Sequence, residues 1–157
     1  MGAHKIVVLE WLYRADQDFG FARLSLKNTN YYDPVCFFFQ QSAEKYLKAY
    51  IVKFGLKFEK THDLSRLLNI CRGRDSSLIF LEDACRFLNP FYLETRYADA
   101  VFAVRAKNEA EEAFRRAEQI QAAIRKNLGI VKEISPAEIE KENRKVDKIL
   151  KGGLTRL

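Results

Sequence analysis

Apolar residues recur every three or four positions along most of the chain, which is the period of an α-helix. A first stripe predicts a helix over residues 4–27 and consists of Val8, Leu12, Ala15, Phe19, Ala22 and Leu26. A second, more apolar stripe predicts a helix over residues 33–54, after a turn at residues 28–32. Asp33 is suited to the N-cap of this helix, Pro34 to its first turn and Gly55 to its end.

Shorter helices and one long helix are expected in the next part of the chain. A short helix begins at Thr61 or His62, and residues 71–77 are typical of a basic loop. A further helix runs from Leu78 to the Asn89–Pro90 pair, because the residue before a proline disfavours helical geometry. Residues 91–98 form an aromatic connector, and a long helix covers residues 99–128 until Gly129. The sequence predicts an all-α fold, an antiparallel up-and-down bundle of four to five helices with an extra C-terminal helix.

The C-terminal segment differs in pattern from the rest. Ser135, Pro136 and Glu138 predict a capping box at the start of a helix over residues 136–151. This helix is mostly charged, and its narrow apolar strip consists of Ile139, Val146, Ile149 and Leu150. We therefore divide the chain into a bundle, residues 1–129, and a C-terminal helical appendage with a tail, residues 130–157. We expect the appendage to contact a second subunit or a partner protein.

Composition limits the class of protein. The chain has 157 residues, which suits one domain with or without an appendage, and a formal net charge of +6. A basic balance favours an anionic partner, although cations and anions are interleaved. Three widely spaced cysteines favour free thiols in a reducing cytoplasm, so we expect a cytoplasmic protein. No apolar run is long enough to span a membrane, so no membrane partner is expected.

Four segments, taken in order, resemble the HEPN domain family. They are WLYRADQDFGFARL, FFFQQSAEKYLKAYIV, THDLSRLL and YLETRYAD, and the resemblance extends over residues 9–128. It implies a helical bundle that dimerises and is often encoded beside a minimal nucleotidyltransferase as a toxin–antitoxin pair. Some members of the family are metal-independent ribonucleases with a motif of an arginine, four to six intervening residues, and then a histidine. Neither His62 nor His4 has an arginine at that spacing.

Three groups of side chains are candidates for a nucleotide or anion site. His62 and Asp63 combine a group that titrates near neutral pH with a carboxylate, although capping of a helix by Thr61, His62 or Asp63 is the simpler explanation. Either Lys45 or Lys48 faces a groove and meets a phosphate, or Lys48 forms a surface pair with Glu44 at helical spacing. Arg96 and Tyr97 either bind an anion and a base or close the bundle. Arg66, Arg72 and Arg74 form either a basic rim near the His62 helix or, as the simpler explanation, a solvated face.

The sequence contains none of the common catalytic signatures, such as GxSxG, a P-loop or HExxH. We therefore expect a nucleotide- or RNA-binding subunit with no cofactor and no metal, the partner of a nucleotidyltransferase in a two-gene system. The alternatives are a divergent metal-independent ribonuclease that uses His62, and a purely structural dimerisation module. A homodimer is expected from the resemblance and from the aromatic content of 13%.

Overall fold

The computed structural model describes residues 2–92 and 104–154, and these residues form α-helices and 3-10 helices but no strand. The all-α prediction is confirmed. The elements in chain order are α1 (Gly2–Asn28), α2 (Tyr32–Lys53), α3 (Leu64–Arg74), η1 (Ser76–Leu81), α4 (Glu82–Leu88), η2 (Asn89–Phe91), α6 (Lys107–Leu128) and α7 (Pro136–Leu154).

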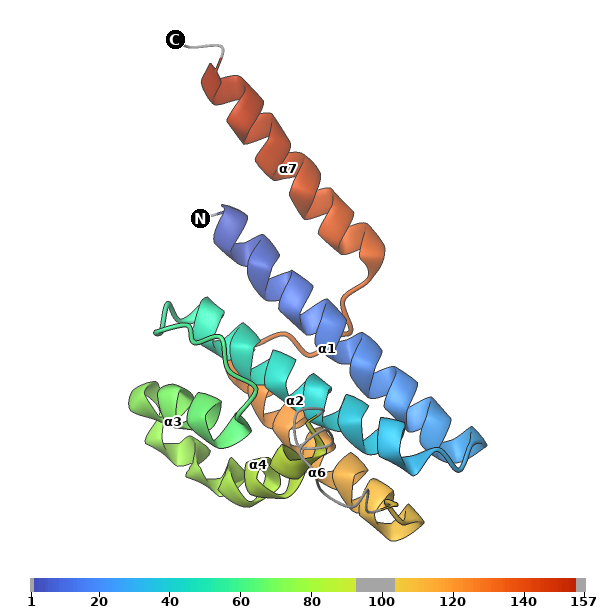
Figure 1. The fold of residues 1–157 in the computed structure, drawn as a ribbon. Helices are drawn as coiled ribbons and strands as arrows, with labels where there is room; N and C mark the ends of the chain where they lie inside the picture. The colour runs from blue at the N-terminus through green and yellow to red at the C-terminus, as the bar shows by residue number, and fades with distance from the viewer. Residues whose placement is uncertain (1, 93–103, 155–157) are drawn as a thin grey trace.

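α2 is the central helix of the bundle. It packs against α1, α3 and α6, while α3 and α4 form a short pair at one side (Figure 1). More than half of its residues are buried, and the largest fully buried side chains in the molecule include Phe39, Tyr46 and Tyr50. The Phe39 ring meets Phe19 of α1 and Phe114 of α6, so one aromatic cluster joins the three long helices.

Two glycines end helices where the sequence predicts it. Gly55 has φ +62° directly after the cap of α2, and Gly129 has φ +66° after α6. A side chain at positive φ is strained, so glycine is the residue that lets the chain turn there. The turn at Gly55 matters for the site, because it sends the following loop back along α2.

The start of α2 is predicted wrongly. Asp33 lies inside the helix, and the residue at the N-cap is Tyr31, whose side chain makes no capping hydrogen bond. The Asp33 carboxylate instead accepts a hydrogen bond of 2.9 Å from the backbone N–H of Arg105, which precedes α6. A contact between segments 72 positions apart in the chain has replaced the local one.

Residues 71–77 were expected to form a loop, and this prediction is wrong, because α3 continues to Arg74. Cys71 is fully buried one turn after Leu67 and Leu68, so packing of this face outweighs the low helix propensity of Gly73. The next expected helix is also different. Residues Ser76–Leu81 form a 3-10 helix, and only Glu82–Leu88 are α-helical.

The last helix of the bundle begins later than predicted. Val104, Arg105 and Ala106 are not helical, and α6 starts at Lys107. The Glu109 carboxylate accepts a hydrogen bond of 3.3 Å from the Ala106 backbone N–H, which fixes the start of the helix. The rest of the predicted extension, residues 99–103, lies outside the described residues.

α7 begins with the predicted capping box. The Glu138 N–H donates to Ser135 Oγ at 3.3 Å, and the Ser135 N–H donates to Glu138 Oε2 at 2.7 Å. The helix lies beside α1 of the same chain, with a Lys5–Glu142 ion pair of 3.4 Å, and then extends past the start of α1 (Figure 1). Ile139 packs on the core, whereas Ile149 and Leu150 are 67% and 61% exposed. α1 therefore covers part of the surface that we expected a partner to cover.

Candidate functional site

His62 lies in the loop between α2 and α3 and contacts a buried carboxylate of α2. Its Nδ1 atom is 3.0 Å from Glu44 Oε2. The backbone of the loop is held as well, because Gln40 Nε2, on the preceding turn of α2, donates to the His62 carbonyl at 3.0 Å. Two contacts from one helix therefore fix both the position and the orientation of the imidazole.

Glu44 is the centre of this group of polar side chains. It is only 4% exposed, yet its carboxylate meets three partners. Lys48 Nζ donates to Oε1 at 2.6 Å, while Gln41 Nε2 at 3.2 Å and the His62 ring reach Oε2. A buried carboxylate is tolerated where an opposite charge and hydrogen bonds replace its water.

Lys48 has no free ammonium for a ligand in this arrangement. The residue is 5% exposed, and its Nζ atom lies 5.5 Å from the centroid of the Trp11 ring and 5.8 Å from that of Phe58. The aromatic faces and Glu44 together stabilise the buried cation. The predicted Glu44–Lys48 pair is confirmed. The pair is buried, however, whereas the spacing alone had predicted a pair on the surface.

The exposed edge of the site is a cleft beside His62. The His62 side chain is 43% exposed, and its ring stacks on the Tyr92 ring with 4.0 Å between the centroids and 15° between the planes. The cleft has a volume of about 590 Å³ and is lined by Lys60, Thr61, His62, Asp63, Asn89, Pro90 and Tyr92. Tyr92 and Asn89 were not predicted as site residues, because neither is near His62 in the chain.

Asp63 caps α3, as one of the predicted alternatives had it. Its carboxylate accepts hydrogen bonds from the backbone N–H groups of Ser65 at 3.0 Å and Arg66 at 3.2 Å. Asn89 donates to the same carboxylate at 2.9 Å and accepts from the Leu64 N–H at 2.8 Å. The hydrogen bond from Asn89, followed by those from the backbone, lowers the pKa of the Asp63 carboxyl. Asp63 therefore stays negatively charged at the rim of the cleft.

The other predicted site residues are not brought into this cleft. Lys45 turns towards α1 and forms an ion pair with Asp18. Burial raises the pKa of the Asp18 carboxyl even though Lys45 acts against it. Arg96 and Tyr97 lie outside the described residues. Among residues 2–92 and 104–154, no group of three histidine, cysteine or acidic side chains is placed to hold a metal ion.

A second buried polar network was not predicted. Tyr46 Oη donates to Asp16 Oδ1 at 2.5 Å, and Arg125 forms an ion pair with the same carboxylate. Arg125 Nη1 also donates to the carbonyls of Ile130 at 3.0 Å and Lys132 at 2.6 Å. Burial, followed by the Asp16 charge, raises the pKa of Tyr46. The network joins α1, α2 and α6 to the linker before α7, which is a structural role.

The family model of the HEPN domain matches residues 8–128 of the chain. The chain belongs to the HEPN domain family. The match covers the bundle from α1 to α6 and includes the His62 cleft, whereas α7 follows it. The family resemblance seen in the sequence is thereby confirmed.

Two solved structures are similar to this HEPN domain. TT1696 from Thermus thermophilus is 30% identical, with 80% of this chain and 98% of that chain covered and a TM-score of 0.67. ST0689, described as an archaeal HEPN homologue, is 26% identical, with 76% and 96% covered and a TM-score of 0.64. No curated protein matches the sequence. In the described residues, no helix combines the length and the apolar character needed to cross a bilayer.

Proposed function

We propose that this HEPN domain binds a nucleotide or the end of an RNA strand in the His62 cleft. The observation that carries the proposal is the stacked His62–Tyr92 pair at the wall of the cleft. Stacking on aromatic rings is a common way in which proteins hold unpaired bases. A half-exposed imidazole that a buried carboxylate holds in place is a preorganised surface for such a ligand.

The charges that line the cleft indicate how a ligand would be oriented. Asp63 is held as an anion at the rim, so the cleft is not a uniform phosphate site. Among the described residues that line the cleft, Lys60 is the lysine, and it is the group that would meet a phosphate. Because Nδ1 of His62 faces Glu44, its Nε2 atom is the one that a ligand would contact. The base and the phosphate are then bound at different places in the cleft.

Titration of the protein with fluorescent mononucleotides and short RNA tests this proposal. We expect His62→Ala and Tyr92→Leu to weaken binding by about tenfold or more, since stacking on one aromatic ring contributes roughly 1–3 kcal/mol. Tyr92→Phe keeps the ring and should bind normally. His4→Ala is the matched control, because His4 is the other histidine of the chain, is exposed and lies 3.4 Å from the Lys53 carbonyl. Equal affinities for all four variants would place the ligand elsewhere.

A second candidate function is ribonuclease activity. It is favoured by the 3.0 Å contact between His62 and Glu44, since a carboxylate that orients an imidazole is common in general acid–base catalysis. The absence of the arginine-to-histidine motif is against it. Cleavage of labelled RNA in the presence of a chelator, with His62→Ala as the control, separates binding from catalysis. Cleavage that His62→Ala abolishes would identify an enzyme.

We also propose a homodimer, and a minimal nucleotidyltransferase as partner in a toxin–antitoxin-like pair of genes. In support of the homodimer, exposed apolar side chains gather on one side of α1 and α2. Phe21 and Leu24 are 54% and 63% exposed, and the Phe21 ring meets Phe38 at 5.0 Å. Sedimentation of the protein and of Phe21→Asp tests the dimer.

A neighbouring nucleotidyltransferase gene, and copurification of its product, test the partner. A structural dimerisation module would dimerise without binding nucleotides.

A further inference from the structure

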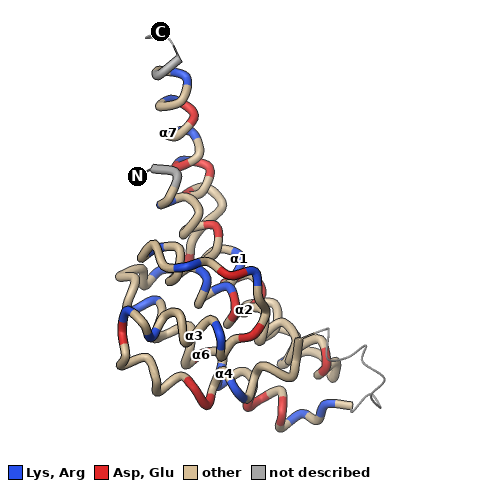
Figure 2. Tube along the Cα trace, turned by 60° about the vertical axis from the view of Figure 1, so that its left-hand side comes forward, with Lys and Arg blue, Asp and Glu red and all other residues tan. Residues whose placement is uncertain are grey.

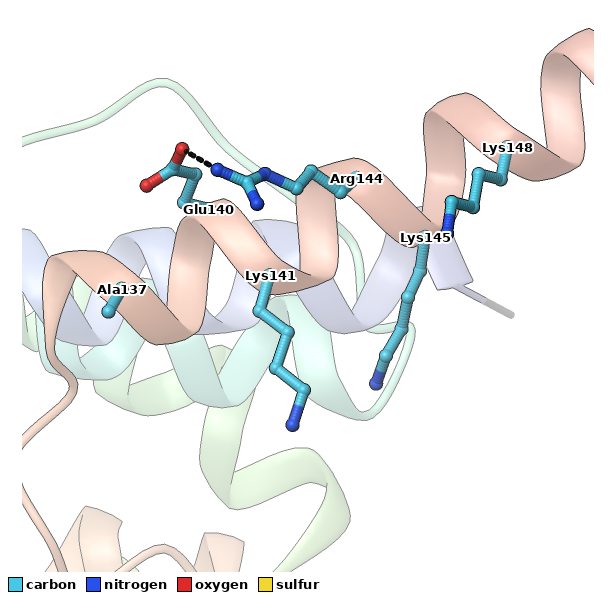
Figure 3. A pocket seen from close by; sticks show the side chains of 6 residues that line it. All are labelled: Ala137, Glu140, Lys141, Arg144, Lys145 and Lys148. Carbon is cyan, nitrogen blue, oxygen red and sulfur yellow. Dashed lines mark hydrogen bonds and ion pairs between the residues drawn. The ribbon is translucent and has the colours of Figure 1, made fainter.

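α7 carries a stripe of cations on the face that turns away from α1. Successive residues of an α-helix are rotated by about 100°, so Lys141, Arg144, Lys145 and Lys148 fall within an arc of about 100°. All four are exposed. They line a groove of about 420 Å³ together with Ala137 and Glu140, and Lys141 and Lys145 extend to the same side of the helix (Figure 3). We call these four residues the basic stripe.

Two of the four cations of the basic stripe pair with acidic residues of α7, whereas no ion pair of the described residues includes Lys141 or Lys148. Glu138 is engaged with the Ser135 cap, and Glu142 binds Lys145 at 2.8 Å and Lys5 at 3.4 Å. Glu140 pairs with Arg144 at 2.6 Å at the border of the stripe. α7 lies beside the N-terminal part of α1 and extends past it, as the ribbon of Figure 1 and the tube of Figure 2 show, so a long ligand can approach the stripe from the side opposite α1.

We propose that the basic stripe binds the phosphodiester backbone of a nucleic acid strand. From Lys141 to Lys148 the helix rises about 10 Å, which spans two to three phosphates of a strand. Phosphate contacts by lysine and arginine dominate such interfaces, whereas lysine is depleted at interfaces between proteins. A membrane surface fits less well, because the apolar side of α7 at Ile139 is already packed against the bundle.

This site is separate from the His62 cleft and lies outside the matched HEPN domain. It contributes affinity without sequence preference, since phosphates carry no base information. The proposal therefore predicts similar binding of oligouridine and oligothymidine. It also predicts that mononucleotides, which lack a continuous backbone, do not detect the stripe.

The test uses the full chain with Lys141→Gln, Lys145→Gln and Lys148→Gln combined. We expect about tenfold weaker binding of oligouridine at low salt. The slope of log K against log salt concentration should also become smaller in magnitude by about two, since each phosphate contact on a single strand contributes roughly 0.7 to that slope. The matched control combines Lys27→Gln, Lys53→Gln and Lys126→Gln, which removes the same charge from exposed positions elsewhere. Replacing the three stripe lysines by arginine should restore binding, and circular dichroism should show the same helix content in every variant.

Three outcomes would overturn the proposal. Equal losses in the stripe and control variants would mean that net charge alone is responsible. An unchanged affinity in the stripe variant would remove the site. Binding of polyglutamate or of anionic vesicles as tight as binding of oligouridine, and equally dependent on the stripe, would assign it to an acidic protein or a membrane. His62→Ala should weaken mononucleotide binding without changing the salt dependence, so the two proposals fail independently.

Discussion

His62 Nδ1 lies 3.0 Å from Glu44 Oε2, although the two residues are 18 positions apart in the chain. The carboxylate is also bound to Lys48 Nζ at 2.6 Å, so one buried anion connects the exposed imidazole to a buried ammonium. The orientation of the His62 ring in the cleft therefore depends on the charges of Glu44 and Lys48, which are buried out of reach of a ligand. This relationship makes Glu44 a positioning residue for His62.

Glu44→Gln should destabilise the fold. The substitution leaves the Lys48 ammonium, 5% exposed, without its counter-charge, and breaking a buried ion pair typically costs about 3–5 kcal/mol. Urea denaturation monitored by circular dichroism measures the free energy of unfolding. Combining Glu44→Gln with Lys48→Met removes both charges and should recover much of the loss. If the double variant is as unstable as the single one, the pair is not the reason for the effect.

Asp63 should make stability depend on pH in the acidic range. Its folded-state pKa is lowered from the ordinary value of 3.8, so its stabilising contribution is complete above that value and is lost as the pH falls through the folded pKa. Denaturation curves recorded from neutral pH to below pH 3.8 test the sign. Asp63→Asn keeps a good N-cap residue without the charge, so it should lose this part of the pH dependence. Asp63→Ala should cost about 1 kcal/mol at neutral pH.

The Asp16–Tyr46–Arg125 network predicts different effects for two buried tyrosines. Tyr46→Phe removes a hydrogen bond to Asp16 and one from Gln121, at 2.5 and 2.7 Å, and should destabilise the protein by about 1–3 kcal/mol. Tyr50→Phe is the matched control. Within the part of the chain that the structure describes, the Tyr50 hydroxyl has one hydrogen bond, which it accepts at 3.2 Å from the exposed Arg74, so a loss well under about 1 kcal/mol is expected. Equal losses would show that the network contributes little.

The local parts of the fold could be predicted from the sequence, and the contacts between distant segments could not. Gly55, Gly129 and the Ser135 capping box follow from rules that involve a few neighbouring residues. The inner stripe of α1 was predicted for the same reason. Asp33 was assigned wrongly because its partner, the Arg105 N–H, is 72 positions away.

The candidate site shows the same limit. Helical spacing indicated the Glu44–Lys48 pair, and the His-Asp order indicated a cap for α3. The direction of each side chain depended on tertiary packing, which sends Lys45 to Asp18 and Lys48 between two aromatic rings. Tyr92 and Asn89 reach the cleft through the fold of α4 and η2 alone. Gln121 and Arg125, two polar residues beside the apolar stripe of α6, are the signals of the second network in that helix.

The division of the chain at residue 129 remains a prediction, and two truncations test it. Deleting residues 136–157 removes α7 but keeps the linker, so the bundle should stay folded with a small loss of stability. Deleting residues 130–157 also removes the Ile130 and Lys132 carbonyls that Arg125 binds. Arg125 would then be a buried cation with fewer acceptors, at a cost of about 1.5–3 kcal/mol for each charged hydrogen bond lost. Thermal unfolding of the two proteins measures the difference. Equal stabilities would place the boundary at residue 129, whereas failure of the first truncation to fold would make α7 part of the core.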